Sequence, residues 1–115
     1  MSAVKVSIAQ INALVGDLSG NAQRVLEAVR LAHAAGAQVL LTPELALTGY
    51  PPEDLLLRPS FIELCDQVLT DLCANLASLK GLHVVVGHVT FQNGLLRNAA
   101  SVLVDGKVLG TYFKR

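Results

Sequence analysis

Apolar side chains recur at two different spacings along the first part of the chain. Residues 4–10 alternate apolar and polar side chains, which predicts a strand, and residues 21–35 repeat apolar side chains at helical spacing. Gly36 follows this helix where a C-terminal glycine is typical, and residues 38–42 form a short apolar strand. A strand, a helix and a second strand in this order predict a parallel βαβ unit with a right-handed crossover.

Prolines and turn residues divide the rest of the chain. Prolines and a glycine interrupt residues 43–58, which we expect to be mainly loop, whereas Pro59 suits the first turn of a helix that runs to about Leu79. Two hairpin turns then join three strands, at residues 83–90, 96–104 and 107–113, with the turns at Asn93–Gly94 and Asp105–Gly106. These elements predict an α/β fold, in which a mixed sheet carries helices on one face.

The composition suggests that this fold is not complete by itself. The chain has 115 residues, of which 52% are hydrophobic and 16% are charged, whereas an average domain has ~25% charged residues. We expect the surfaces of so apolar a chain to be covered by further protein, either in an oligomer or as the first part of a larger domain. Nothing after the last predicted strand resembles a C-terminal cap, and we expect an incomplete fold.

Charge and cysteine content exclude several classes of function. The 9 basic and 9 acidic residues cancel, so the chain lacks the positive charge that nucleic-acid phosphates require. No apolar run reaches the ~18–20 residues of a membrane-spanning helix, and no segment resembles a secretion signal. Two cysteines do not make a disulfide framework, and we expect a cytoplasmic protein.

Two charged residues stand at the ends of predicted strands, where ligands bind in α/β sheets. Glu44 follows residues 38–42, and burial there would raise the pKa of its carboxyl group and make it a general base. The alternative is that Glu44 only pairs with a loop amide or a nearby cation. Lys114 follows residues 107–113 and could stabilise an oxyanion, although a lysine in such a position is commonly only solvated.

The other reactive residue types give weaker signals. Cys65 and Cys73 lie on the second predicted helix without a basic residue nearby, so we expect both to be buried and structural. The three histidines lack metal-ligand spacing, and the acidic pair Glu53 and Asp54 fits helix-start or turn chemistry. The chain contains no P-loop, GxGxxG or GxSxG motif.

Several motifs together resemble the nitrilase, or carbon–nitrogen hydrolase, superfamily. They are AQINALVGDLSGN (Ala9–Asn21), PEL (Pro43–Leu45), TGY (Thr48–Tyr50) and YFKR (Tyr112–Arg115). The stretch PPEDLLLRPSF (Pro51–Phe61) resembles more narrowly the N-terminal glutamine-amidase domain of the glutamine-dependent NAD synthetases. The resemblance implies a nitrilase-like αββα sandwich, whose layers pack together by dimerisation. Residues 1–115 would form only the N-terminal, first half of that domain.

The resemblance also implies a catalytic site built from a glutamate, a lysine and a cysteine. Glu44 matches the glutamate that acts as general base, and Lys114 matches the lysine that stabilises the oxyanion. Tyr50 matches, more weakly, a tyrosine that lines the glutamine pocket. The nucleophilic cysteine of the superfamily comes after the lysine, so neither Cys65 nor Cys73 matches it. Residues 1–115 alone are therefore predicted to be inactive.

The reaction implied by the resemblance is hydrolysis of the glutamine side-chain amide, which supplies ammonia for NAD synthesis from deamido-NAD and ATP. ATP and Mg²⁺ would bind in a synthetase domain outside residues 1–115, and no cofactor or metal is expected in this part. A homo-oligomer is expected. Two alternatives stay open: a stand-alone nitrilase-family amidase, and an inactive nitrilase-like module that acts by association.

Overall fold

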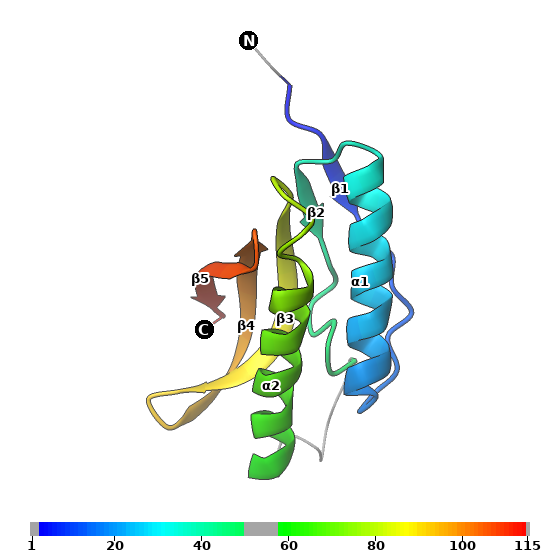
Figure 1. The fold of residues 1–115 in the computed structure, drawn as a ribbon. Helices are drawn as coiled ribbons and strands as arrows, with labels where there is room; N and C mark the ends of the chain where they lie inside the picture. The colour runs from blue at the N-terminus through cyan, green and yellow to red at the C-terminus, as the bar shows by residue number, and fades with distance from the viewer. Residues whose placement is uncertain (1–2, 50–57, 115) are drawn as a thin grey trace.

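A five-stranded sheet and two helices make up the computed structural model, which describes residues 3–49 and 58–114 (Figure 1). The elements are β1 (Val6–Ile8), α1 (Leu18–Ala34), β2 (Val39–Leu41), α2 (Pro59–Asn75), β3 (His83–Gln92), β4 (Leu95–Val104) and β5 (Lys107–Phe113). The strands lie in the sheet in chain order. β1, β2 and β3 are parallel, whereas β4 and β5 are each antiparallel to the preceding strand, so the predicted mixed sheet is confirmed.

Local signals at its two ends determine the extent of α1. The Asp17 carboxylate accepts a hydrogen bond from the Gly20 N–H at 3.1 Å, which caps the helix. The helix therefore begins at Leu18, earlier than the predicted residue 21. Gly36 follows the helix with a positive φ of 80°, a conformation that glycine adopts without strain, as predicted.

The second helix and the two hairpins also follow local signals. α2 begins at Pro59 as predicted, but it ends at Asn75 rather than Leu79, because the next N–H groups bond to carbonyls only three residues back. Both central residues of each hairpin turn, Asn93–Gly94 and Asp105–Gly106, have positive φ, as type I′ turns require. Neither helix of the described ranges is long and apolar enough to cross a membrane.

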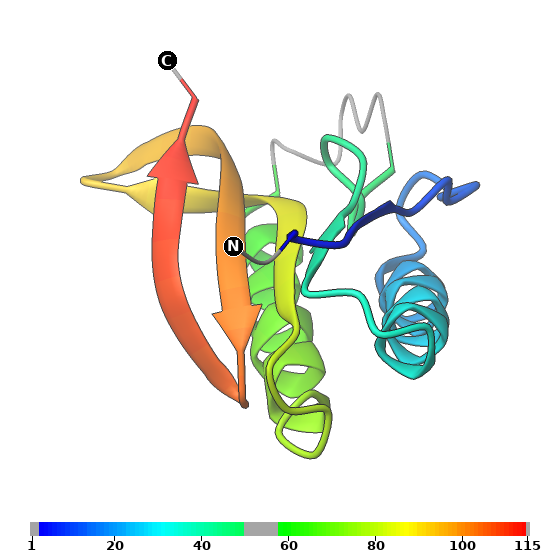
Figure 2. The ribbon, with the colours of Figure 1, turned by 90° about the horizontal axis from the view of Figure 1, so that it is seen from above.

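The hydrophobic core lies between the sheet and the two helices, which pack on the same face (Figure 2). The sheet contributes side chains that are at most 2% exposed: Leu40, Val84, Val86 and Leu103. The helices contribute fully buried side chains: Val25, Val29, Ile62 and Cys65. The prediction that the helices lie on one face of the sheet is confirmed.

The opposite side of the sheet, which we call the open face, carries exposed apolar side chains. Val6 is 51% exposed, Ile8 73% and Leu41 38%. Ile8 pairs with Leu41 and Leu41 with Val85, so these side chains lie in one row across neighbouring strands. The open face therefore carries a row of apolar side chains that the described residues leave uncovered.

Candidate active site

The turn that follows β2 carries Glu44 over the neighbouring strand β3. Thr42 anchors the start of this turn, because its Oγ1 atom donates to the Val85 carbonyl at 2.9 Å and accepts from the Gly87 N–H at 3.2 Å. Gly87 also permits the close approach, since a Cβ atom there would lie 2.5 Å from the Pro43 carbonyl oxygen. The position of Glu44 therefore depends on a glycine in the adjacent strand.

Asn98 in β4 and Lys114, directly after β5, reach the carboxylate of Glu44. The Lys114 Nζ atom lies 3.0 Å from Glu44 Oε1, and Asn98 Nδ2 donates a hydrogen bond to the same oxygen. The Lys114 N–H also donates to the Asn98 carbonyl at 2.8 Å. The structure thus brings together two predicted site residues that are 70 positions apart, and it adds Asn98, which the sequence analysis did not single out.

The electrostatic surroundings of Glu44 differ from the prediction. The Glu44 side chain is 49% exposed and that of Lys114 is 61% exposed. The hydrogen bond from Lys114, then that from Asn98 and the charge of Lys114, lowers the pKa of the Glu44 carboxyl below its ordinary value. The prediction that burial raises this pKa is therefore wrong in this structure, because desolvation on the open face is weaker than the two donors. The two donors therefore hold the Glu44 carboxylate in the ionised form that a base requires.

A cavity of about 320 Å³ on the open face includes both charged residues in its lining. Val85 and Tyr112 supply apolar surface to the same cavity, and Asn98 supplies an amide. Apolar walls with a few convergent polar groups are typical of small-molecule sites. A carboxylate base beside an ammonium group suits a reaction in which a proton is removed while negative charge develops nearby.

Comparison with known proteins identifies the family of this chain. The profile of the family described as Carbon-nitrogen hydrolase matches residues 5–115. The chain belongs to the carbon–nitrogen hydrolase family. The resemblance that the motifs around Glu44 and Lys114 indicated is therefore confirmed.

Similar proteins of this family include NAD synthetases and amidases. A glutamine-dependent NAD(+) synthetase from Xanthomonas campestris is 40% identical over 113 residues, which are 97% of this chain and 20% of that protein. A crystal structure of a glutamine-dependent NAD(+) synthetase from Cytophaga hutchinsonii matches with a TM-score of 0.90 at 26% identity, over 99% of this chain and 19% of that one. An amidase from Nesterenkonia sp. shares the fold, with a TM-score of 0.77 at 23% identity over 96% of this chain and 42% of that one.

These comparisons confirm the expected fold and define how much of it is covered. The α/β arrangement of this chain matches solved structures of carbon–nitrogen hydrolase relatives almost along its whole length. The chain spans about a fifth of the length of the curated relatives it matches. The family shown by the comparisons therefore applies to the chain, whereas the activity of a whole relative does not follow from it directly.

The two cysteines lie away from Glu44 and Lys114. Cys65 and Cys73 are free and buried on α2, which packs on the face of the sheet opposite the open face (Figure 2). Burial, followed by the charge of Asp66, raises the pKa of the Cys65 thiol to about 12, and burial also raises the pKa of the Cys73 thiol. Their predicted buried positions are confirmed, and both thiols are protonated and shielded from the cavity.

The other residues named in the sequence analysis lie either outside the described residues or away from the cavity. Tyr50, Glu53 and Asp54 lie outside the described residues. Within residues 3–49 and 58–114, no three His, Cys, Asp or Glu side chains form a group that could hold a metal ion. His88 is 3% exposed, and its Nε2 atom lies 2.7 Å from Ser101 Oγ, so this histidine belongs to the interior of the sheet rather than to the cavity.

Proposed function

We propose that residues 1–115 form the N-terminal part of the glutamine-hydrolysing domain of a glutamine-dependent NAD synthetase. The proposal rests mainly on the position of Glu44 and Lys114, 3.0 Å apart in a cavity of a carbon–nitrogen hydrolase fold. The 40% identity with the Xanthomonas NAD synthetase supports this enzyme over a stand-alone amidase, as does the higher TM-score of the Cytophaga structure.

Glu44 is proposed to be the general base and acid of the reaction. A cysteine thiol from outside residues 1–115 gives its proton to the Glu44 carboxylate, and its sulfur attacks the side-chain carbonyl carbon of glutamine. Glu44 then passes the proton to the departing nitrogen, and ammonia leaves as a thioester forms. Water hydrolyses the thioester after giving a proton to Glu44, which releases glutamate and returns the proton to the thiol.

Lys114 is proposed to stabilise the oxyanion that forms when the carbonyl carbon becomes tetrahedral. An ammonium group has three donors, so Lys114 can hold Glu44 Oε1 at 3.0 Å and also meet a developing oxyanion in the same cavity. Its positive charge also keeps Glu44 ionised before the reaction begins. Tyr50 is proposed to line the glutamine pocket, a role supported by its place in the TGY motif alone.

Covering of the open face would complete this site. We propose that further protein, from the rest of the domain or from a second copy in a homo-oligomer, covers Ile8, Leu41 and the cavity beside them. The exposed apolar row on this face supports such a cover. Removing water from Glu44 would raise its pKa from the lowered value and make it a stronger base.

ATP and Mg²⁺ are proposed to act in a separate synthetase domain, where the released ammonia converts deamido-NAD to NAD. The chain itself has no P-loop motif, and its described residues contain no cluster of three metal-ligating side chains. Among the described residues that line the cavity, Glu44 is the one carboxylate, and it is paired with Lys114, so we propose no step at this site that involves ATP or Mg²⁺. The enzyme is proposed to be cytoplasmic.

Transfer of the amide nitrogen tests the proposed function directly. The intact protein that contains residues 1–115 is supplied with deamido-NAD, ATP, Mg²⁺ and glutamine labelled with ¹⁵N in its side-chain amide. We expect ¹⁵N in the NAD formed. Release of labelled ammonia without NAD synthesis would favour a stand-alone amidase. Absence of glutamine hydrolysis would contradict the proposal and favour a module that acts by association. Residues 1–115 alone are expected to be inactive.

A further inference from the structure

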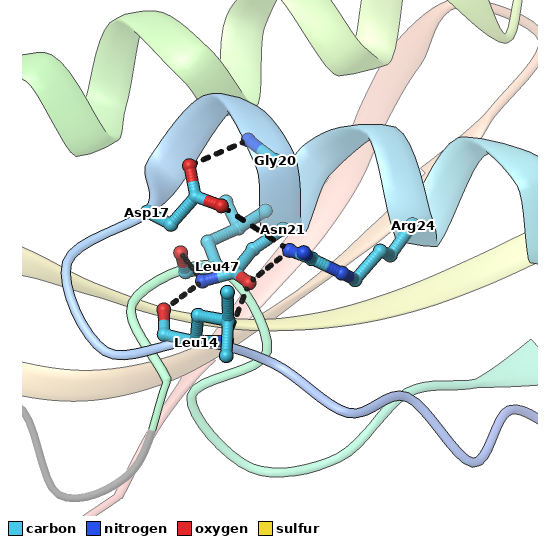
Figure 3. Close-up of polar contacts among 6 residues, drawn as sticks. All are labelled: Leu14, Asp17, Gly20, Asn21, Arg24 and Leu47. Carbon is cyan, nitrogen blue, oxygen red and sulfur yellow. Dashed lines mark hydrogen bonds and ion pairs between the residues drawn. The ribbon is translucent and has the colours of Figure 1, made fainter.

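A buried asparagine connects α1 to two segments that lie outside the helix (Figure 3). Asn21 is 0% exposed, and its Oδ1 atom accepts a hydrogen bond from the Leu14 N–H at 2.8 Å. Its Nδ2 atom donates to the Leu14 carbonyl at 2.7 Å and to the Leu47 carbonyl at 2.9 Å. One amide group therefore joins the loop before α1 to the turn that carries Glu44.

Leu47 is held on both sides of its backbone. Its N–H donates to the Gly87 carbonyl of β3 at 3.2 Å, and its carbonyl accepts from Asn21. The Leu47 side chain is 0% exposed, so a carbonyl that lost this donor would have few alternatives inside the core. The turn that begins at Glu44 is thus attached to the sheet through one peptide group and to α1 through the next.

The loop before α1 supports the same turn a second time. The Gly16 N–H donates to the Thr48 carbonyl at 2.9 Å. Gly49 has a φ of 75°, and a Cβ atom on it would lie 2.7 Å from the Val15 backbone nitrogen. The two backbones therefore lie in direct contact at Gly49. This support comes from the C-terminal half of the AQINALVGDLSGN motif, through Leu14, Val15, Gly16 and Asn21.

The turn needs support because part of its backbone is strained. Leu45, the residue directly after Glu44, has a φ of 54°, a backbone conformation that residues other than glycine rarely adopt. Such a conformation persists only where the surrounding structure maintains it, and it is common at functional sites. We therefore expect that loss of the bond to the Leu47 carbonyl lets this backbone relax and moves the Glu44 carboxylate away from Lys114 and Asn98.

We propose that Asn21 is a positioning residue for Glu44, which holds the catalytic turn in place through the Leu47 carbonyl. Its effect on catalysis rests on the proposed function, whereas its effect on the turn does not. A purely structural role, in which Asn21 only joins α1 to Leu14, is the alternative. The two roles differ in whether a change at Asn21 affects Glu44 itself.

Asp17 provides the matched control for this test. Asp17 lies at the same end of α1. Its carboxylate accepts a hydrogen bond from the Gly20 N–H at 3.1 Å and pairs with the Arg24 guanidinium at 3.4 Å, but it makes no hydrogen bond to the described part of the turn. Asp17→Ala therefore weakens the beginning of the helix and leaves the contact with Leu47 in place. Arg24 also donates to Asn21 Oδ1 at 3.0 Å, a bond that does not involve the turn.

The experiment compares Asn21→Ala with Asp17→Ala in the intact protein. We expect Asn21→Ala to lower kcat for glutamine hydrolysis by ~10-fold or more with KM nearly unchanged, and to shift the acid limb of the pH profile upward. Ammonia-dependent NAD synthesis should stay at the wild-type rate. We also expect hydrogen exchange at the Leu47 and Gly49 amides to become ~10-fold faster or more. Asp17→Ala should change none of these quantities.

Two results would overturn the proposal: wild-type exchange and pH profile in Asn21→Ala, or equal changes in the two variants. If Asn21→Ala does not fold, Asn21→Asp takes its place, because it keeps the acceptor for the Leu14 N–H and loses the donor to the Leu14 and Leu47 carbonyls. The exchange rates do not depend on activity. A protein without glutaminase activity would therefore contradict the proposed function, while exchange at Leu47 would still decide whether Asn21 holds the turn.

Discussion

The two faces of the sheet are made from the same strands but have opposite character. On the face covered by the helices, Val84, Val86 and Leu103 are at most 1% exposed and pack against α1 and α2. On the open face, Ile8 is 73% exposed and Tyr112 is 70% exposed, and the ion pair of Glu44 with Lys114 lies beside them. Alternation along each strand places every residue on one face or the other.

This difference assigns stability mainly to the covered face of the sheet and the reaction mainly to the open face. The covered face has buried apolar contacts and two inert thiols, so changes there should act on folding. The open face has the charged pair and a cavity of about 320 Å³, so changes there should act on the reaction. The turn from Thr42 to Gly49 crosses between the two, because Leu47 is buried while Glu44 is exposed.

Of the two side chains that donate to Glu44 on the open face, the lysine should give the larger effect when it is removed. We expect Lys114→Ala in the intact protein to lower glutamine hydrolysis by about 10²–10³-fold, because the oxyanion loses its cation. Ammonia-dependent NAD synthesis and the thermal unfolding midpoint should stay unchanged, since the side chain is 61% exposed. Lys107→Ala, on the exposed start of β5, is the control and should behave as wild type. A wild-type glutaminase rate in Lys114→Ala would remove Lys114 from the site.

Shortening a buried side chain on the covered face should lower stability without changing the reaction. Leu103 is 0% exposed, and Leu103→Ala should lower the free energy of unfolding by ~2–5 kcal/mol through lost contacts and an empty volume. The turnover of the folded fraction should equal that of wild type. Chemical denaturation measures the free energy of unfolding. Active-site titration gives the amount of folded, active protein to which the turnover is referred. Leu31→Ala, at a position that is 74% exposed, should change stability by less than ~0.5 kcal/mol.

A methyl group at Gly87 should affect both stability and activity. Its Cβ atom would lie 2.5 Å from the Pro43 carbonyl oxygen and 2.6 Å from the Leu45 nitrogen, so Gly87→Ala should displace the turn that carries Glu44. We expect a loss of ~1–3 kcal/mol in unfolding free energy, as for other overpacked sites, together with a lower kcat. Gly110→Ala meets no atom within 4 Å and serves as the control. If Gly87→Ala changed stability with full activity, the turn would not need this close approach.

Loss of Asn98 should give the smallest effect, one on pH dependence. The pKa of Glu44 is lowered by Lys114 first and by Asn98 second, so Asn98→Ala should raise it part of the way to its ordinary value. Glu44 is a base only when ionised, and activity falls as the pH drops through its pKa. The acid limb of the glutaminase profile should therefore move to higher pH in Asn98→Ala. An unchanged limb would show that another group determines it.

The order of the elements could be predicted because it depends on local signals. Apolar spacing, Pro59, Gly36 and the two hairpin turns each act within a few residues, and the structure confirms the elements they indicate. One end of each helix differs from the prediction, because the Asp17 cap extends α1 and tighter turns end α2 at Asn75. Such ends depend on single hydrogen bonds that spacing alone does not define.

The site was only partly predictable, because its contacts are between distant segments. The position of Glu44 after a strand pointed to the correct sheet edge, but the direction of its pKa shift depends on Asn98 and Lys114, which the strand register brings near. Asn98 had a signal that was not used: it is a polar residue in an otherwise apolar alternate row of β4. Asn21 had none beyond its motif, because its partners Leu14 and Leu47 bond through backbone atoms.

The central claim, that Glu44 on the open face is the base of glutamine hydrolysis, is tested most directly by one ratio. It is the rate of NAD synthesis with glutamine divided by the rate with ammonia, measured in the intact protein for wild type and Glu44→Gln. Glutamine at position 44 keeps the size of the side chain but cannot accept the proton. We predict that the ratio falls by about 10²–10⁴-fold, with the ammonia rate unchanged. An unchanged ratio, or an equal loss of both rates, would contradict the claim.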